Sequence, residues 1–219
     1  MTAVPFEDLR SSAENTSNVR KTLGAVVYIA PESAPLITSL VDATGKVTAL
    51  PVGYEAFGLL TEDGISFERE IDEEEVRALG HVSAVRRDIT GATRTVGFSA
   101  LEYDKRIVRE LADSVDLSTI KESATGEITY DVPDLPEKKH YRLLVIGRDG
   151  SLSSEILRAK FYPRVSTSSL PSEAWNSADP LAAEFQFTAY TDETAGFITR
   201  EFLAGAGVNG VELGFKPAV

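Results

Sequence analysis

FGLLTEDGISFEREID, residues 57–72, is the segment around which the rest of the predicted fold is arranged. Two short apolar runs flank the turn Glu62-Asp63-Gly64, where glycine supplies the positive φ that a tight β-hairpin needs. Polar and apolar residues alternate in the second run, so a strand here has one apolar side and one acidic side. The apolar side carries Ile65, Phe67 and Ile71, interrupted by Arg69, and the acidic side carries Ser66, Glu68, Glu70 and Asp72. The stretch therefore predicts a hairpin whose three carboxylates face water or cations.

The 219-residue chain is strongly acidic. It contains 22 Lys and Arg against 34 Asp and Glu, a formal net charge of −12. This excess argues against a surface that grips nucleic acid or an anionic membrane, because both need clustered cations. The same charge suits a surface that must not hold DNA, since like charges repel, and solubility alone explains it equally well. We expect no membrane binding.

Cysteine is absent from the sequence, so the fold has no disulfide and no thiolate site. No apolar run reaches the length of a signal-peptide core, or the roughly 20 residues of a membrane span. We therefore expect the protein to be made and kept in a cytoplasm until it assembles.

Short strands account for most of the remaining pattern. Residues 25–30 (AVVYIA) predict a buried strand that ends before Pro31. The sequence RDGS at 148–151 predicts a second hairpin turn. Gly91 predicts a turn between two of the strands. The other predicted strands cover residues 47–50, 82–90, 94–101, 128–132, 141–146, 152–165 and 184–190.

One helix is predicted over residues 104–117. Its apolar residues recur at helical spacing and form one stripe, which would cover an open end or face of the sheets. Asp104 is placed to cap the N-terminus of this helix. The stripe consists of Ile107, Val108, Leu111, Ala112 and Val115. Residues 73–79, at the end of an acidic run, form either a short helix or a solvated loop.

These elements define the domain organisation. Residues 1–22 are polar and predict a flexible N-terminal arm, residues 23–205 form the β domain, and residues 206–219 form a C-terminal arm. Residues 31–54 contain three prolines and predict a long loop, which is usually functional or ordered by a partner. The predicted class is mainly β: an antiparallel β-sandwich or barrel with one flanking α-helix.

No catalytic residue or cofactor site is predicted. His81 and His140 lack a second ligand at i+2 to i+4, so the sequence predicts no metal site. Residues 205–210 match G-x-G-x-x-G, but they neither follow a strong strand nor open a helix. Trp175, the single tryptophan, lies in a loop, either as an anchor for a partner or as a local packing plug.

Several segments resemble the major tail tube proteins of long-tailed bacteriophages, especially those that infect actinobacteria. The similar segments are Asn18-Val19-Arg20, GAVVYIAP at 24–31, FGLLTEDGI at 57–65, and the blocks 95–111 and 185–202. They cover roughly residues 18–205, and the resemblance lies in order and spacing, with no catalytic signature.

The resemblance implies a structural virion protein without an active site or cofactor. Subunits of this family are β-sandwiches flanked by a helix, and six of them form a ring that stacks into a hollow tube. The expected partners are other copies of the chain, the tape measure protein, the tail terminator and distal tail proteins, and double-stranded DNA that passes without specific binding. The loop near 31–54 and both arms would stack the rings and be ordered only by neighbours.

Acidic strand sides are the candidates for the lining of such a lumen. A negative bore repels the phosphate backbone and lets DNA slide without sticking. Exposure on the outer wall of the tube is the alternative. The candidate residues are Glu68, Glu70, Asp72, Glu127 and Asp131.

Two other classes of protein share this composition. A monomeric carbohydrate-binding or adhesin-like β-sandwich would show aromatic side chains on one exposed sheet face. A jelly-roll glycoside hydrolase would need two placed carboxylates in a cleft flanked by aromatics. Here most aromatic residues lie on the apolar sides of the predicted strands, which favours the structural, self-assembling protein.

Overall fold

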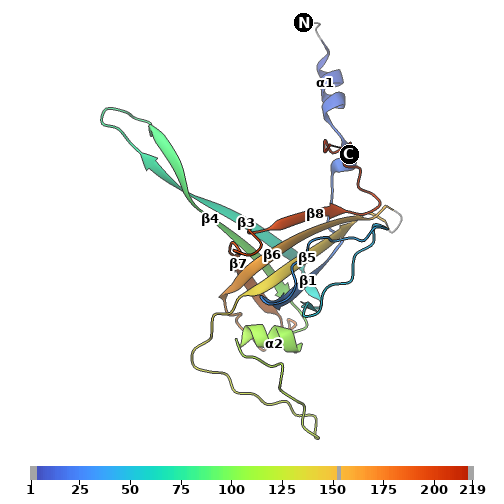
Figure 1. The fold of residues 1–219 in the computed structure, drawn as a ribbon, viewed down its shortest axis with the longest axis vertical. Coiled ribbons are helices and arrows are strands. Elements are labelled where there is room, and N and C mark those ends of the chain that lie inside the picture. The colour runs from blue at the N-terminus through green and yellow to red at the C-terminus, as the bar shows by residue number, and fades with distance from the viewer. Residues whose placement is uncertain (1–3, 152–153, 217–219) are drawn as a thin grey trace.

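The computed structural model describes residues 4–151 and 154–216 and confirms a mainly β, antiparallel fold. Strand order in the sheet is β2-β1-β5-β6-β7-β4-β3, with β8 also paired to β6 (Figure 1). The strands are β1 (Gly24–Pro31), β2 (Glu55–Ala56), β3 (Leu60–Val76), β4 (Arg86–Ala100), β5 (Tyr141–Asp149), β6 (Ile156–Ser169), β7 (Ala183–Ala189) and β8 (Arg200–Ala204). The helices are α1 (Phe6–Ala13), a 3-10 turn (Thr16–Asn18) and α2 (Arg106–Ala112).

Strand β6 turns this single sheet into a sandwich. Its residues 157–161 pair with β5 on one side and β8 on the other, whereas residues 165–169 pair with β7. A strand that passes from one layer to the next in this way folds the sheet back on itself. We call β2, β1, β5, β8 and the first half of β6 the β1 layer. The β4 layer consists of the second half of β6, β7, β4 and β3.

An aromatic cluster fills the space between the two layers. Phe57 lies at its centre, with ring centroids 4.7 Å from Phe98 and 5.3 Å from Phe185. The amide of Phe57 also donates to the carbonyl of Val27, at 3.0 Å, which ties the segment between β2 and β3 to the β1 layer. Edge-to-face and tilted contacts of this kind add to the free energy gained by burying the rings.

Helix α2 closes one end of the sandwich, as its apolar stripe predicted (Figure 1). Ile107, Val108, Leu111 and Ala112 are buried in the core. The helix is shorter than the predicted 104–117, and the predicted cap is wrong. Lys105 is the N-cap residue, without a side-chain cap, because the carboxylate of Asp104 accepts from Arg109 instead. The helix ends before Ser114, which has a φ of 56°.

Residues 32–53 pack on the other face of the β1 layer. Ile37 and Leu40 are buried there against β5 and β6, and the Tyr54 hydroxyl donates to the carbonyl of Pro35 at 2.8 Å. The expectation that neighbours alone order this loop is therefore wrong, because its own subunit holds it. A stacking role for the loop stays a prediction. The strand expected at 47–50 is reduced to one bridge between Val41 and Val47.

Burial of three tyrosines predicts that the fold loses stability in alkali. Burial is the main cause that raises the pKa of Tyr54, Tyr103 and Tyr141 to about 12, from an ordinary 10. Unfolded tyrosines ionise first, so this contribution is complete below pH 10 and disappears between pH 10 and 12. We expect urea unfolding free energies to be constant from pH 8 to about 10 and then to fall. Tyr54→Phe and Tyr141→Phe should each weaken the fall; equal pH profiles would contradict this origin.

The predicted hairpin at residues 62–64 is wrong. Gly64 does have a positive φ, of +80°, but it lies in a bulge of one continuous strand, β3, and not in a hairpin turn. Pairing jumps there from Leu60–Ala100 to Ile65–Phe98. The partner of β3 is β4, and the connecting turn is at residues 77–85.

Three neighbouring predictions fail for the same reason. Residues 73–76 belong to β3 and form neither a helix nor a loop, and Gly91 lies inside β4, opposite Asp72. The strand predicted from residue 82 begins at Arg86. Long-range pairing of the two strands overrides the local preferences of an acidic run and a glycine. An ion pair of 2.8 Å from Arg87 to Glu75 joins the strands across this region.

Predictions for the second half of the chain are mostly confirmed. Strands β5 and β7 match the predicted 141–146 and 184–190, and a turn after Asp149 joins β5 to β6. Strand β6 begins at Ile156, and residues 152–153 lie outside the described residues. The strand predicted at 128–132 does not form. The N-terminal arm contains helix α1, which was not predicted, and strand β8 forms at the end of the β domain, before residue 206; residues 1–3 and 217–219 are not described.

Candidate functional site

The outer face of the β4 layer is polar and acidic, and we call it the acidic face. Residues paired across neighbouring strands share a face of a sheet. Glu68 pairs with Thr95, and Thr95 with Thr188, so one row of the face crosses β3, β4 and β7. The acidic face comprises Ser66, Glu68, Glu70 and Asp72 of β3, Gly91, Thr93, Thr95, Gly97 and Ser99 of β4, and Glu184, Gln186 and Thr188 of β7.

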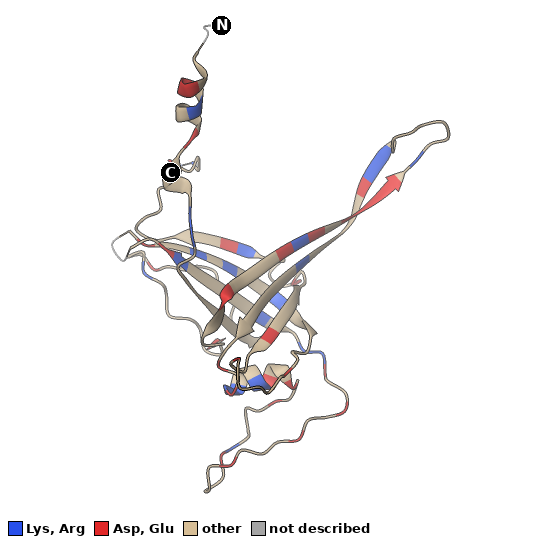
Figure 2. Cartoon of the chain, turned by 180° about the vertical axis from the view of Figure 1, so that it is seen from behind, with Lys and Arg blue, Asp and Glu red and all other residues tan. Residues whose placement is uncertain are grey.

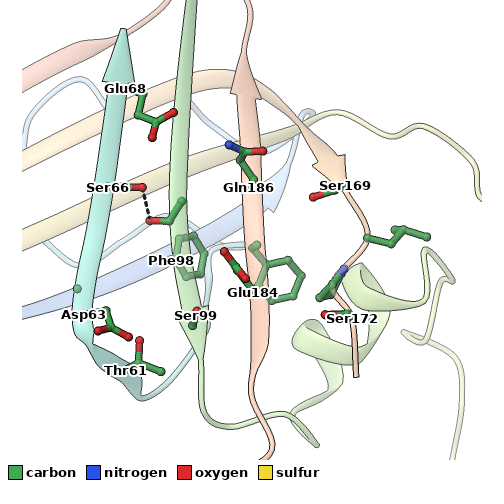
Figure 3. A pocket seen from close by; sticks show the side chains of 15 residues that line it. Thr61, Asp63, Ser66, Glu68, Phe98, Ser99, Ser169, Ser172, Glu184 and Gln186 are labelled. Atoms are coloured by element: carbon green, nitrogen blue, oxygen red, sulfur yellow. Dashed lines mark hydrogen bonds between the residues drawn. The ribbon is translucent and has the colours of Figure 1, made fainter. Parts of the chain in front are cut away.

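Hydroxyl and amide groups surround the carboxylates of this face (Figure 3). Thr95 Oγ1 donates to Glu68 Oε2 at 3.2 Å, and Ser66 Oγ donates to the carbonyl of Gly97 at 3.4 Å. A hollow of about 600 Å³ lies over β3, β4 and β7, next to the chain that leaves β6 at Ser169. None of the aromatic core side chains stands out on this face, because Phe185 and Phe187 point into the sandwich.

Cations of the same strands point to the opposite side. Arg69 and Arg94 are paired across β3 and β4 on that side, and Arg69 forms an ion pair of 2.8 Å with Glu201 of β8. Lys160 of β6 reaches the same carboxylate and lies over the ring of Phe67, 4.5 Å from its centroid. Among the described residues, the three β3 carboxylates of the acidic face therefore form no ion pair.

The structure does not bring the other two predicted lumen residues to this face. Glu127 and Asp131 are exposed in the loop of residues 113–140, which extends away from α2 (Figure 1). Pro133 and Pro136 follow closely, and no neighbouring strand offers a partner, so the alternating pattern there does not become a strand. The five candidates thus form two separate groups.

A half-buried tyrosine anchors the loop of residues 113–140 to α2. The Tyr130 hydroxyl donates to Asp113 at 2.7 Å and accepts from Arg109 at 3.3 Å. Arg109 also donates to Asp104, and these bonds raise the pKa of the Arg109 guanidinium. Ser114 donates to the carbonyl of Glu137 at 3.0 Å, which closes the base of the loop. The loop is held at two points while its apolar side chains Ile128, Val132 and Leu135 stay exposed.

A long two-stranded ribbon is the feature that sequence reasoning missed. Strands β3 and β4 continue together far beyond the body, and we call residues 70–92 the ribbon (Figure 1). Both acidic and basic residues lie along it (Figure 2), with Arg87 and Arg77 each bonded to Glu75. Its exposed apolar side chains are Ile71, Val76, Leu79, Val82, Val85 and Ile89. A signal was available: after the bulge, no glycine or proline interrupts β3 before Gly80.

An isolated ribbon of this kind is only marginally stable in water, because two strands bury little apolar surface. The ribbon exposes six apolar side chains. A monomeric protein rarely exposes so many on one protruding segment. The ribbon is therefore a candidate surface for contact with another molecule.

A family model described as "Phage tail tube protein" matches residues 12–201. The chain belongs to the phage tail tube protein family. The resemblance noted in the sequence is confirmed over nearly the whole β domain. A solved structure described as "Tail of empty GTA particle computed with helical refinement, C6 symmetry" is similar with a TM-score of 0.34 and 9% identity, over 80% of this chain and 92% of that chain. No curated protein matches the sequence.

This tail tube protein is a structural component of the phage virion. Its family is a structural one and is not known for enzymatic activity. In the described part of the chain, no group of three or more His, Asp or Glu side chains is arranged to hold a metal ion. No helix in residues 4–151 and 154–216 is both long and apolar enough to cross a membrane.

Proposed function

We propose that six copies of the chain close into a ring, that rings stack into the tail tube, and that the acidic face lines the channel for DNA. Six per ring is what the family resemblance implies. The observation that carries the proposal is a four-stranded layer with two open edges and a face that carries carboxylates and no cation. Copies that join edge to edge would continue this layer around a lumen.

The chemistry of the acidic face suits a passage for DNA. Duplex DNA carries about one negative charge per 1.7 Å of its axis, so it binds wherever clustered Lys or Arg displace its counterions. The acidic face instead offers Glu68, Glu70 and Asp72, with hydroxyl groups between them. The carboxylates repel phosphates, and the short neutral side chains give a polyanion little to hold.

Ribbon, arms and loops would then join one ring to the next. A ring closes through a heterologous interface, and stacking continues the assembly as a filament. The exposed apolar side chains at the ribbon tip need a partner of their own, and the next ring supplies one in every subunit. The tape measure protein would occupy the lumen before DNA, and the terminator and distal tail proteins would bind the two ends of the tube. Before assembly the subunit would remain in the host cytoplasm.

Electron microscopy of the purified protein tests this function directly. Rings or hollow tubes are expected after concentration, and discrete small particles under every condition would contradict self-assembly. A monomeric carbohydrate-binding module is disfavoured because the exposed β4-layer face carries no aromatic platform.

Charge reversal on the acidic face tests the lumen assignment. In Glu68→Lys/Glu70→Lys, both side chains are exposed and form no ion pair among the described residues, so folding and tube formation should be unaffected. Two lysines per subunit would place twelve cations in each ring of six, and DNA delivery should fall by at least tenfold in an infection assay. Glu127→Lys/Asp131→Lys carries the same charge change on the loop of residues 113–140. Normal infectivity of the Glu68/Glu70 variant would place the acidic face on the outer wall.

A further inference from the structure

The two open edges of the β4 layer fit one another. Its four strands alternate in direction, so the edges, β3 and the second half of β6, run antiparallel. Pairing between β5 and β6 ends at Tyr141–Val165, which leaves residues 166–169 open on the side away from β7. A second copy can therefore place its β3 beside this part of β6 without breaking the alternation. This step rests on the proposed ring.

Copies that join edge to edge without a stagger come level along the rows of the layer. Ser66, Gly97, Gln186 and Ser169 form one row across the layer, and Figure 3 shows the chain after Ser169 at the edge opposite β3. Residues that follow Ser169 continue past the level of residue 65 toward that of residue 60. The loop of residues 170–182 therefore faces the start of β3 in the next copy.

That loop carries the single tryptophan of the chain. Trp175 is 84% exposed, so it does not act as a packing plug in its own subunit. Its indole N–H already donates to Glu173, which leaves both faces of the ring free for apolar contact. Exposed Leu170 lies on the same loop. An uncovered tryptophan with a satisfied polar atom is what an interface anchor requires.

A cleft lies where the next copy would receive it. Between the two layers, along the start of β3, is an opening of about 670 Å³. Its apolar lining includes Leu23, Leu59 and Phe67, of which Leu23 and Leu59 are mostly exposed. Arg158 and Lys160 line the same cleft, and Arg158 forms no ion pair with any described residue. The volume lies in the range of pockets that bind a bulky group.

The charge and the shape of this cleft are complementary to the segment around Trp175. Glu173 accompanies Trp175 and would meet the free guanidinium of Arg158, while the indole ring would cover Leu59 and Phe67 and lie near the cations. We infer that Trp175 of each copy inserts into this cleft of the next copy and locks neighbouring subunits side by side in the ring. The contact is heterologous, with residue 175 of one copy on residue 59 of the next, so a two-fold dimer cannot satisfy it and a rotation that closes gives a ring.

Tryptophan fluorescence tests the insertion, because Trp175 is the only emitter of its kind. Monomers should show the emission of a solvent-exposed indole. On assembly the emission should shift to shorter wavelength, and quenching by acrylamide should fall several-fold. Rings or tubes with unshifted, fully quenchable emission would overturn the inference and leave the proposed function intact. Absence of any assembly would overturn both.

Cysteine cross-linking tests the head-to-tail geometry in a chain that has no cysteine of its own. Oxidised Leu59→Cys/Trp175→Cys should give a ladder of covalent oligomers that stops at the hexamer. Either single variant alone should give none, and a mixture of the two should give only dimers. Val52→Cys/Trp175→Cys is the matched control, since Val52 is fully exposed on the loop over the β1 layer. Dimers from Trp175→Cys alone, or an equal ladder from the control, would overturn the inference.

Discussion

Phe57→Ala is expected to lower the free energy of unfolding by about 3–5 kcal/mol, the usual cost of emptying an aromatic site in a core. The side chain is 0% exposed and contacts three other phenylalanines, Phe98, Phe185 and Phe187. It joins the β1 layer to the β4 layer, so neither layer can move in to fill the cavity without breaking strand pairing. Most domains are stable by only about 5–15 kcal/mol, so a large part of the stability would be lost.

Urea unfolding followed by circular dichroism measures this effect. Phe6→Ala is the control, because Phe6 lies in α1 with 72% of its surface exposed and no partner in the core. Its cost should stay within about 0.5 kcal/mol. A loss at Phe57 no larger than that of the control would mean that the aromatic cluster does not hold the layers together.

The core strands could be predicted because their signal is local. Strands β1, β5 and β7 are short runs of β-branched and aromatic residues, buried on one or both faces, and their side chains alone indicate the structure. The signal for α2 is equally local, because four apolar residues at helical spacing form one buried face. Only the ends of these elements were misplaced, where a cap or a register shift depends on distant residues.

The ribbon was missed because the local preferences of its residues outweighed the one signal for a long strand, the absence of glycine and proline between Gly64 and Gly80. Residues 73–76 are three glutamates and a valine, which favour a helix start or a loop when taken alone. In the fold they are held as a strand by pairing with residues 86–89, which lie ten to sixteen positions further along the chain. Turns were wrongly predicted at Gly64 and Gly91, because glycine also occurs at bulges and at close contacts between strands.

Part of the acidic face was predicted from the sequence. Alternation placed Glu68, Glu70 and Asp72 together on one side, and the structure agrees. The threonines and glycines of β4 that complete the face could not be assigned, because nothing in the sequence gives the register between the two strands. The segment with Glu127 and Asp131 shows the same alternation but has no partner strand. It therefore forms a loop, because a strand is stabilised by pairs with a neighbouring strand.

Leu79→Ser/Val82→Ser at the ribbon tip is expected to abolish stacking of rings into tubes while leaving the subunit folded. Both side chains are fully exposed in the subunit, so its thermal unfolding midpoint should not change. If the next ring covers them, each subunit loses the burial of two apolar side chains, roughly 3 kcal/mol at the low end. Six tips act together in one ring, so the loss of stacking free energy approaches about 18 kcal/mol per ring junction. The remaining contacts between rings would not compensate for a loss of this size.

Sedimentation and electron microscopy distinguish the outcomes for the ribbon. Loss of tubes with retention of rings is the expected result, because the tip lies far from the body of the sandwich, where the start of β3 and the second half of β6 would join copies (Figure 1). Ser83→Asp is the matched control: it adds a charge at the exposed tip without removing apolar surface, so it should reduce stacking far less. Tubes of normal length from the double serine variant would show that the tip faces solvent in the assembly. The rings would then have to be joined by the arms, or by the loops of residues 32–53 and 113–140.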